Sequence, residues 1–239
     1  MKATISMFFY MVKQITQEMM MVMLVIAPFL AGVCFKFGIP AIENTILKHF
    51  GLQDILIPYY DWFSWLLAML IGMLFAFVGG LVVLGEIDDR IAKYVMVTPA
   101  GMKGYLTSRI FLPALLSGIV ACFCVPVFAL TKIDFLTLLV MISSTMLSGM
   151  VTAFLVVAIS SNKVEGMAIG KLSGFFGITF FFPLFIKGWA RYLFFAFPMF
   201  WIGEWSVNGR WYCLIFAFLE YVIWMYALFH RFKRKIGKY

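Results

Sequence analysis

Residues 85–109 read GEIDDRIAKYVMVTPAGMKGYLTSR, the densest stretch of charge inside a chain that is 64% hydrophobic and only 13% charged. Long apolar runs lie on both sides of it, over residues 62–84 and 110–130. Soluble domains are about 45–50% apolar, so this composition indicates an integral membrane protein. A helix that crosses the hydrocarbon needs about 20 mainly apolar residues, so the chain has room for about six spans.

The sequence predicts an all-α integral membrane protein with a single transmembrane domain over residues 1–239. The expected spans cover residues 19–37, 62–84, 110–130, 135–159, 167–186 and 211–228. The charged segment then connects the second span to the third. No room is left for a separate soluble domain.

Two further segments are too polar or too broken to cross a bilayer. Residues 1–18 place Ile5, Phe8 and Val12 among polar groups, which predicts an amphipathic helix at the membrane interface. Residues 187–206 hold charges and a proline inside a Phe- and Trp-rich stretch whose apolar pieces are too short to span. This pattern predicts a re-entrant region between the fifth and sixth spans.

Six spans place both termini on one side, and the basic residues indicate which side that is. Thirteen of the 19 lysines and arginines fall on the side of the termini and the charged segment. The other six are Lys36, Lys48, Lys132, Lys187, Arg191 and Arg210. Cytoplasmic loops carry an excess of Lys and Arg, so we expect a multi-pass bacterial cell-membrane protein with both termini in the cytoplasm. The excess of basic residues on the cytoplasmic side accounts for the net charge of +8, so we expect no nucleic-acid partner.

Within the charged segment, residues 86–98 have the periodicity of a helix with one apolar face. That face holds Ile87, Ile91, Tyr94 and Val95. Asp88 and Asp89 would lie in its first turn, where carboxylates interact favourably with exposed N–H groups, and Pro99 would end it. On chemistry alone, two interpretations stay open: a loop with a solvated charged face, and a helix that docks a partner protein.

The order of the motifs resembles the permease subunit of an ABC exporter of the ABC-2 type. The resemblance is carried by Gly85-Glu86 at the start of the segment, by Val97-Thr98-Pro99, and by the basic Arg109 at the mouth of the third span. It implies that residues 1–18 form a connecting helix and residues 187–206 external re-entrant helices. It also implies that residues 86–98 form a coupling helix that seats in a groove of a separate ATPase.

The resemblance assigns contacts with the ATPase to eight residues. The polar contacts would be made by Glu86, Asp88, Asp89, Arg90 and Lys93, and the apolar ones by Ile91, Tyr94 and Val95. Relatives often carry Gly-Thr at Arg90-Ile91 and an acid at Lys93, so the identity of the fitting ATPase stays open.

ATP hydrolysis is expected in another chain. Gly166–Lys171 is one residue short of a phosphate-binding loop and is followed by Leu172, which lacks the hydroxyl that would hold magnesium. We therefore expect no catalytic residue and no bound cofactor or metal here, with ATP and Mg²⁺ held by the partner ATPase. The resemblance implies two ATPase copies and two permeases, most simply a homodimer.

Seven residues are candidates for a substrate path through the membrane: Met69, Met73, Phe77, Phe175, Phe176, Phe180 and Glu220. Met and Phe form soft apolar surface, which suits a hydrophobic or amphipathic substrate such as a peptide toxin, a bacteriocin or a lipophilic drug. Lipid-facing or core positions are the alternative for the apolar residues. An ionisable group inside a span is costly, so Glu220 has either a transport role or a protein-facing packing role.

Lys187, Arg191 and Glu204 are candidates for an external gate, or equally for interfacial anchors. The predicted function is thus the permease subunit of an ATP-driven exporter. A membrane assembly protein without transport is an alternative, because six spans and a basic tail are generic. An intramembrane enzyme is a weaker one, because the sequence has no paired-histidine metal motif and only two histidines.

Overall fold

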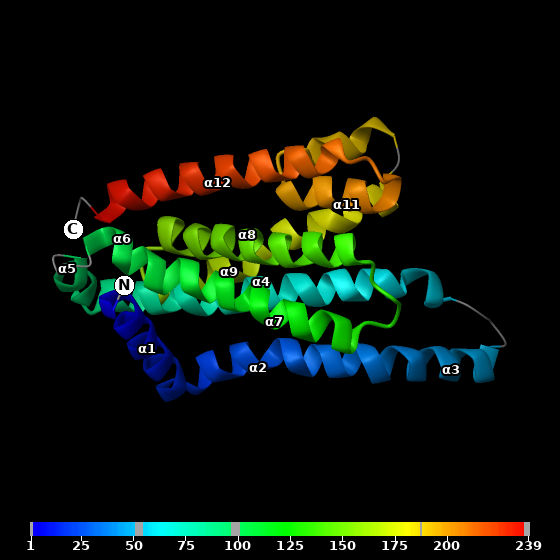
Figure 1. Cartoon of the computed structure of the whole chain (residues 1–239), viewed down its shortest axis with the longest axis horizontal. Coiled ribbons are helices and arrows are strands. Elements are labelled where there is room, and N and C mark those ends of the chain that lie inside the picture. Colours follow the sequence, from blue (N-terminus) through cyan, green and yellow to red (C-terminus); the bar gives the residue numbers. More distant parts are fainter. Residues whose placement is uncertain (1, 51–54, 97–100, 187, 237–239) are drawn as a thin grey trace.

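The computed structural model describes residues 2–50, 55–96, 101–186 and 188–236. Within these ranges the fold is all-helical and has six helical stretches long and apolar enough to cross a membrane, which confirms the predicted fold class in outline. They cover Met19–His49, Ile57–Asp88, Gly101–Phe128, Phe135–Ile159, Lys163–Phe185 and Tyr212–Lys235. The helices run roughly along one long axis, and both chain termini lie at the same end of the bundle (Figure 1).

We call that end the terminal end. The opposite end, where residues 189–208 lie, we call the hairpin end. In chain order the helices are α1 (Lys2–Gln17), α2 (Met19–Val33), η1 (Cys34–Gly38), α3 (Ile39–Phe50), η2 (Ile57–Tyr59), α4 (Tyr60–Asp88), α5 (Ile91–Met96), α6 (Gly101–Leu106), η3 (Thr107–Phe111), α7 (Leu112–Phe128), α8 (Phe135–Ile159), α9 (Lys163–Ile178), η4 (Thr179–Phe181), α10 (Phe182–Phe185), η5 (Trp189–Phe194), α11 (Pro198–Asn208) and α12 (Tyr212–Ile236). The elements η1 and η3 are single π-helical turns inside longer helices.

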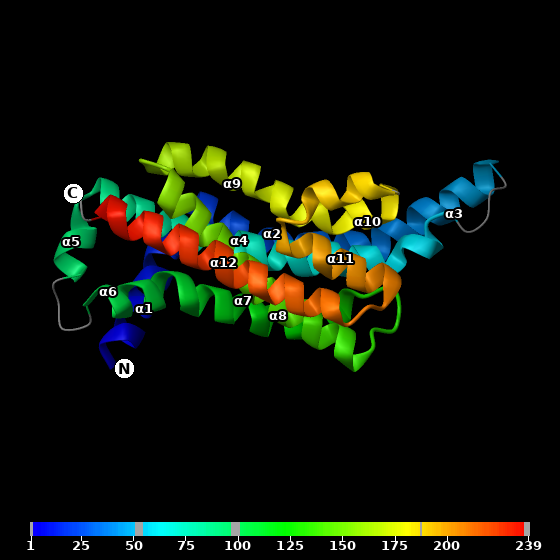
Figure 2. The same cartoon turned by 90° about the horizontal axis from the view of Figure 1, so that it is seen from above.

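Helix α4 forms the centre of the bundle and contacts α2, α7, α8 and α9 (Figures 1 and 2). In the most apolar 18-residue stretch of the second span, which is mostly α4, 72% of the residues are buried within the chain, and in that of α8 the share is 67%. In the spans that contain α2, α9 and α12, the buried share of the corresponding stretch is only 17%, 28% and 22%. The fold therefore has a tight core of α4 and α8, with large apolar faces of the outer helices left for lipid or a partner.

Close approach of α4 to α8 depends on two glycines. A Cβ at Gly72 would collide with the backbone carbonyl oxygen of Thr145, and a Cβ at Gly149 would lie 2.9 Å from the carbonyl oxygen of Gly72. The Thr145 hydroxyl donates to the carbonyl oxygen of Ala68 at 3.1 Å, so a hydrogen bond also links the helices where they are closest. Small residues permit this kind of packing between membrane helices.

The first span is longer than the predicted residues 19–37, and helix continues through η1 into α3 as far as the described residues reach. Lys36 is accommodated because its ammonium group donates to the carbonyl oxygen of Val127 at 2.6 Å. Beyond it, Glu43 accepts hydrogen bonds from the backbone N–H groups of Leu56 and Ile57, both at 3.3 Å. These contacts stabilise a helix that continues beyond the predicted end of the first span.

The predicted single helix over residues 86–98 is also divided in two. Helix α4 extends to Asp88, because its last turns are still packed against the core, and Arg90 then adopts a left-handed conformation with φ of 61°. Helix α5 follows, so Asp88 ends one helix instead of starting another. The expected stop at Pro99 lies outside the described residues.

We expect Gly72→Ala to lower the free energy of unfolding by about 1–3 kcal/mol, because the added methyl group overpacks the α4–α8 contact. The measurement is thermal unfolding of the purified protein in detergent. Gly174→Ala is the matched control, since a Cβ there meets no atom within 4 Å. Equal melting temperatures for the two variants would contradict the close approach.

Candidate functional site

A buried ion pair joins the second and third spans at the terminal end. Glu86 and Arg109 are each only 2% exposed. Arg109 Nη2 lies 2.5 Å from Glu86 Oε1, and Nε lies 3.1 Å and 3.2 Å from the two carboxylate oxygens. Glu86 is in the last turn of α4, while Arg109 is presented by the π-helical turn η3, a local distortion often found at functional positions.

Arg109 extends this pair to the N-terminal helix. Its Nη1 donates a short hydrogen bond to the carbonyl oxygen of Met7 in α1. The guanidinium carbon also lies 5.9 Å from the centroid of the fully buried Tyr105 ring. A single side chain therefore connects α1, α4 and the start of the third span.

A second, more exposed set of contacts surrounds the same end of α4. Asp88 Oδ2 accepts a hydrogen bond from the backbone N–H of Lys163 at 2.9 Å. Lys163 Nζ lies 2.5 Å from Glu18 Oε2, at the junction of α1 with α2. Asn162 caps α9 by accepting from the N–H of Glu165 at 2.8 Å. The start of α9 is thus linked to both α4 and the α1–α2 junction.

The connection from α4 to α5 presents an exposed surface that we call the turn surface: Asp88, Asp89, Arg90, Ile91 and Tyr94. The Tyr94 side chain is 75% exposed, so most of a large aromatic ring is left accessible. Val95 is partly buried against the core. Glu86 points into the bundle and does not share this surface, contrary to the expected contact with an ATPase. The side chain of Lys93 lies outside the described part of the structure.

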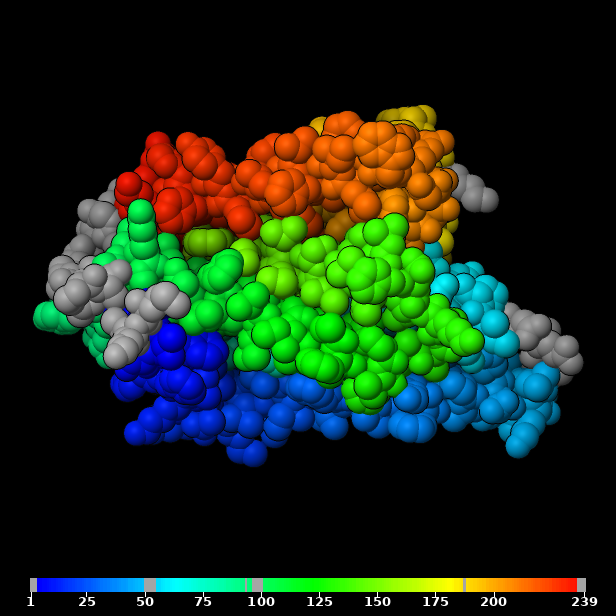
Figure 3. Space-filling model, in the orientation of Figure 1, coloured from blue at the N-terminus to red at the C-terminus, as the bar shows by residue number. Residues whose placement is uncertain are grey.

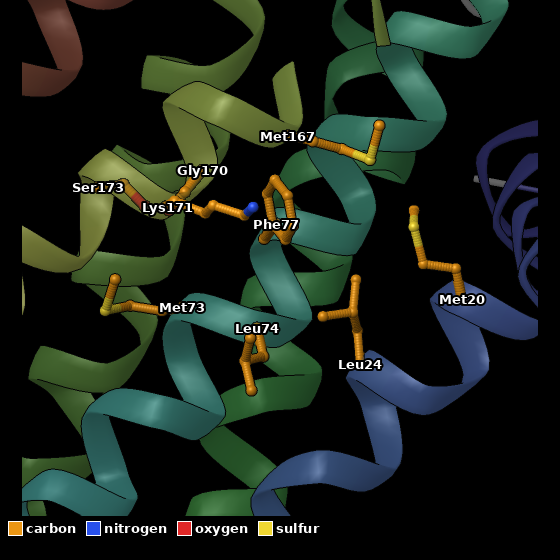
Figure 4. A pocket seen from close by; sticks show the side chains of 9 residues that line it. All are labelled: Met20, Leu24, Met73, Leu74, Phe77, Met167, Gly170, Lys171 and Ser173. Atoms are coloured by element: carbon orange, nitrogen blue, oxygen red, sulfur yellow. Dashed lines mark hydrogen bonds between the residues drawn. The ribbon is translucent and has the colours of Figure 1, made fainter. Parts of the chain in front are cut away.

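A pocket of about 290 Å³ lies between α2, α4 and α9. Figure 4 shows its lining, which is Met20, Leu24, Met73, Leu74, Phe77, Met167, Gly170, Lys171 and Ser173. Met73 and Phe77 are two of the predicted path residues. The contributions of α2 and α9 were not predicted, because nothing in the spacing of Met20 or Met167 indicates which helices become neighbours.

The other predicted path residues lie elsewhere. Met69 is buried on α4, one turn from Met73. Phe180 is fully buried, with its ring centroid 4.7 Å from that of Trp65, so it belongs to the core. Phe175 and Phe176 pack edge-on against Phe197 from the hairpin end, at 5.6 and 5.0 Å.

Glu220 joins α12 to the segment before it. Its Oε1 accepts a hydrogen bond from Trp201 Nε1 at 2.9 Å, and the same N–H lies 2.7 Å from the carbonyl oxygen of Phe195. The Trp201 ring stacks on Phe216 of α12, with centroids 4.9 Å apart. This environment places Glu220 in a contact between α11 and α12, and not in the pocket.

The predicted gate residues Arg191 and Glu204 are ion-paired, with Nη1 and Oε1 3.4 Å apart. Glu204 is 2% exposed and also accepts from Asn208 Nδ2 at 2.8 Å. The pair connects η5 to α11 at the hairpin end. Lys187 lies outside the described residues.

This architecture is that of a multi-pass membrane protein with an apolar pocket between three of its membrane-crossing helices. A family model described as "Fluoroquinolones export permease protein Rv2686c-like" matches residues 11–229, and the chain belongs to this family. The chain is therefore an export permease, which is a transport subunit, and this is consistent with a permease of the ABC-2 type. No curated protein and no solved structure matches the chain.

The Glu86–Arg109 pair generates a prediction for a double-mutant cycle. Glu86→Gln and Arg109→Met should each lower the free energy of unfolding by about 3–5 kcal/mol, because each leaves a buried group of the pair without its partner. The double variant should be less destabilised than the sum of the two, as measured by thermal unfolding in detergent.

The exposed pair between Lys163 and Glu18 is the control for that cycle. Their side chains are 27% and 45% exposed, so Lys163→Gln should change stability by less than about 1 kcal/mol. If the loss of unfolding free energy in the double variant equalled the sum of the losses for Glu86→Gln and Arg109→Met, the two side chains would not interact.

Proposed function

We propose that this chain is the permease subunit of an ATP-driven ABC exporter, which moves a hydrophobic or amphipathic molecule out of the cell. The observation that carries the proposal is the family match over residues 11–229, nearly the whole chain. ATP and Mg²⁺ are held by a separate ATPase subunit, and this chain supplies the membrane path and the contact with that subunit.

The ATPase docks on the turn surface. Asp88, Asp89 and Arg90 offer hydrogen bonds and ion pairs, while Ile91 and Tyr94 offer apolar contact, and all are exposed in the isolated chain. Large aromatic residues that are accessible and surrounded by polar groups are typical anchors of protein interfaces. This arrangement supports docking without the continuous helix that the sequence suggested.

Motion passes from the turn surface to the spans through the buried ion pair. When the two ATPases close on ATP, the displaced turn surface moves the end of α4, to which it is directly connected. Because Glu86 and Arg109 are joined, the start of the third span and α1 follow as one body. Rigid-body movements of this kind are a common route from a local event to a large rearrangement.

The substrate is an aromatic, lipophilic molecule. The matched family is named for export of fluoroquinolones, which are planar aromatic acids. Methionine and phenylalanine side chains adapt to rings of varied shape, and the pocket between α2, α4 and α9 is lined mainly by such residues. Peptide toxins and bacteriocins share the lipophilic character but need a larger space than about 290 Å³ in one protomer.

Two permeases and two ATPases complete the exporter, with two copies of this chain in the simplest assembly. The exposed apolar faces of α2 and α9 support this, because they flank the pocket and are accessible to a second copy or to lipid. Apart from Lys171, which lies within α9, the twelve other basic residues on the terminal side support a cytoplasmic location for both termini and the turn surface.

Tyr94→Ala should reduce both co-purification of the ATPase and ATP-dependent transport in proteoliposomes by about tenfold, since interface anchors of this type contribute at least about 1.4 kcal/mol. Tyr226→Ala is the matched control, because Tyr226 is 73% exposed on α12, away from the turn surface. Normal co-purification and transport with Tyr94→Ala would contradict docking at this surface.

A further inference from the structure

Lys171 is an ionisable residue inside a membrane-crossing helix. It lies eight residues after the start of α9, which corresponds to about 12 Å along the helix axis. The fifth candidate span has 23 residues, from Lys163 to Phe185, and Lys171 is the ninth of them, so it lies inside the span and not at its end. A lysine inside a span is costly and usually faces a partner group or a polar cavity.

No such partner is present among the described residues. The side chain is exposed, and it forms no ion pair or hydrogen bond within the described part of the chain. Lys36 and Lys235 provide the contrast, because each has its ammonium group on a backbone carbonyl oxygen, of Val127 and of Val157 respectively. The fold thus provides hydrogen-bond acceptors for the ammonium groups of two other lysines within its spans, whereas the ammonium group of Lys171 stays accessible to a ligand.

The side chain of Lys171 borders the apolar pocket. Figure 4 shows it reaching from α9 toward the Phe77 ring of α4, with Met73 and Leu74 farther along the same helix. Among the described residues that line the pocket, Lys171 is the one with a charge. A cation beside Met, Leu and Phe side chains is complementary to an amphiphile that has an acidic group and an aromatic or aliphatic body.

We infer that Lys171 receives the acidic group of the exported molecule, while Phe77 and the pocket methionines hold its apolar body. The inference rests on the proposed export function and extends it by assigning a specificity-determining residue. An exporter built in this way selects carboxylic acids over their neutral derivatives. Removal of the charge then weakens binding of the acid without closing the pocket.

The test compares a quinolone carboxylic acid with its methyl ester. Binding to the purified full-length chain is measured in phosphatidylcholine nanodiscs, in buffer with a metal chelator, because the keto acid otherwise binds magnesium. Lys171→Gln should weaken binding of the acid about tenfold and leave binding of the ester unchanged. Lys171→Arg, which keeps the charge, should retain binding of the acid, and Lys132→Gln controls for net charge because Lys132 is exposed in the α7–α8 connection.

A second variant tests the pocket independently of the charge. A Cβ at Gly170 would collide with the Phe77 ring, so Gly170→Ala should move that ring and weaken binding of acid and ester alike. If Lys171→Gln weakened binding of the acid and of the ester equally, the inference would be overturned. It would also be overturned if binding of neither was weakened. Displacement of the acid by phosphatidylglycerol would also overturn it, if Lys171→Gln abolished that displacement, because Lys171 would then bind lipid phosphate.

The binding assay needs no ATPase, so it is separable from the test of the proposed function. If the wild-type chain bound the acid no better than the ester, while ATP-dependent transport of the ester was intact, only the role of Lys171 would be overturned. Absence of any ATP-dependent transport by the wild-type complex, with selective binding of the acid intact, would overturn the export function instead.

Discussion

A carboxylate and a guanidinium that are almost inaccessible to solvent hold the terminal end of this bundle together. Burying either charge alone would cost several kcal/mol, so Glu86 and Arg109 are compatible with the fold only while they contact one another. Their geometry fixes the end of α4 against η3, and the remaining guanidinium nitrogen holds α1 through the carbonyl oxygen of Met7. The turn surface begins two residues after Glu86, so it is directly attached to this buried contact.

The remainder of the molecule has an uneven distribution of packing. Helices α4 and α8 approach closely through Gly72 and Gly149 and form a core with little freedom to deform. Helices α2, α9 and α12 have largely exposed apolar faces, and the pocket opens among two of them and α4. A tightly packed centre, next to outer helices with largely exposed apolar faces, suits a protein that has to open and close a path.

Much of the fold could be predicted from the sequence because a membrane imposes strong constraints. The fourth span was expected at residues 135–159 and is α8, since Asp134 caps its start with an accepted bond from the N–H of Leu136 and a polar patch follows its end. The division after Asp88 was missed, because helical periodicity is insensitive to a single left-handed residue such as Arg90.

The site was predictable only in part, for a related reason. Periodicity gives the face of a helix on which a side chain lies but not the helix that faces it. Exposure of Tyr94 agrees with a surface role, whereas burial of Glu86 depends on Arg109, which is 23 residues away in the sequence. Phe180 and Phe77 have the same chemistry, yet one packs between tryptophans and the other lines a pocket. Only the arrangement of the helices distinguishes them.

The proposed coupling of ATP hydrolysis to transport depends most directly on the buried pair of Glu86 and Arg109. The decisive measurement is the number of substrate molecules transported per ATP hydrolysed by the reconstituted exporter with Arg109→Lys, which keeps the charge but cannot contact both Glu86 and Met7 in the same way. We expect the ATPase subunit to bind and hydrolyse ATP normally while transport per ATP decreases severalfold. An unchanged ratio of transport to hydrolysis in a correctly folded variant would contradict the account.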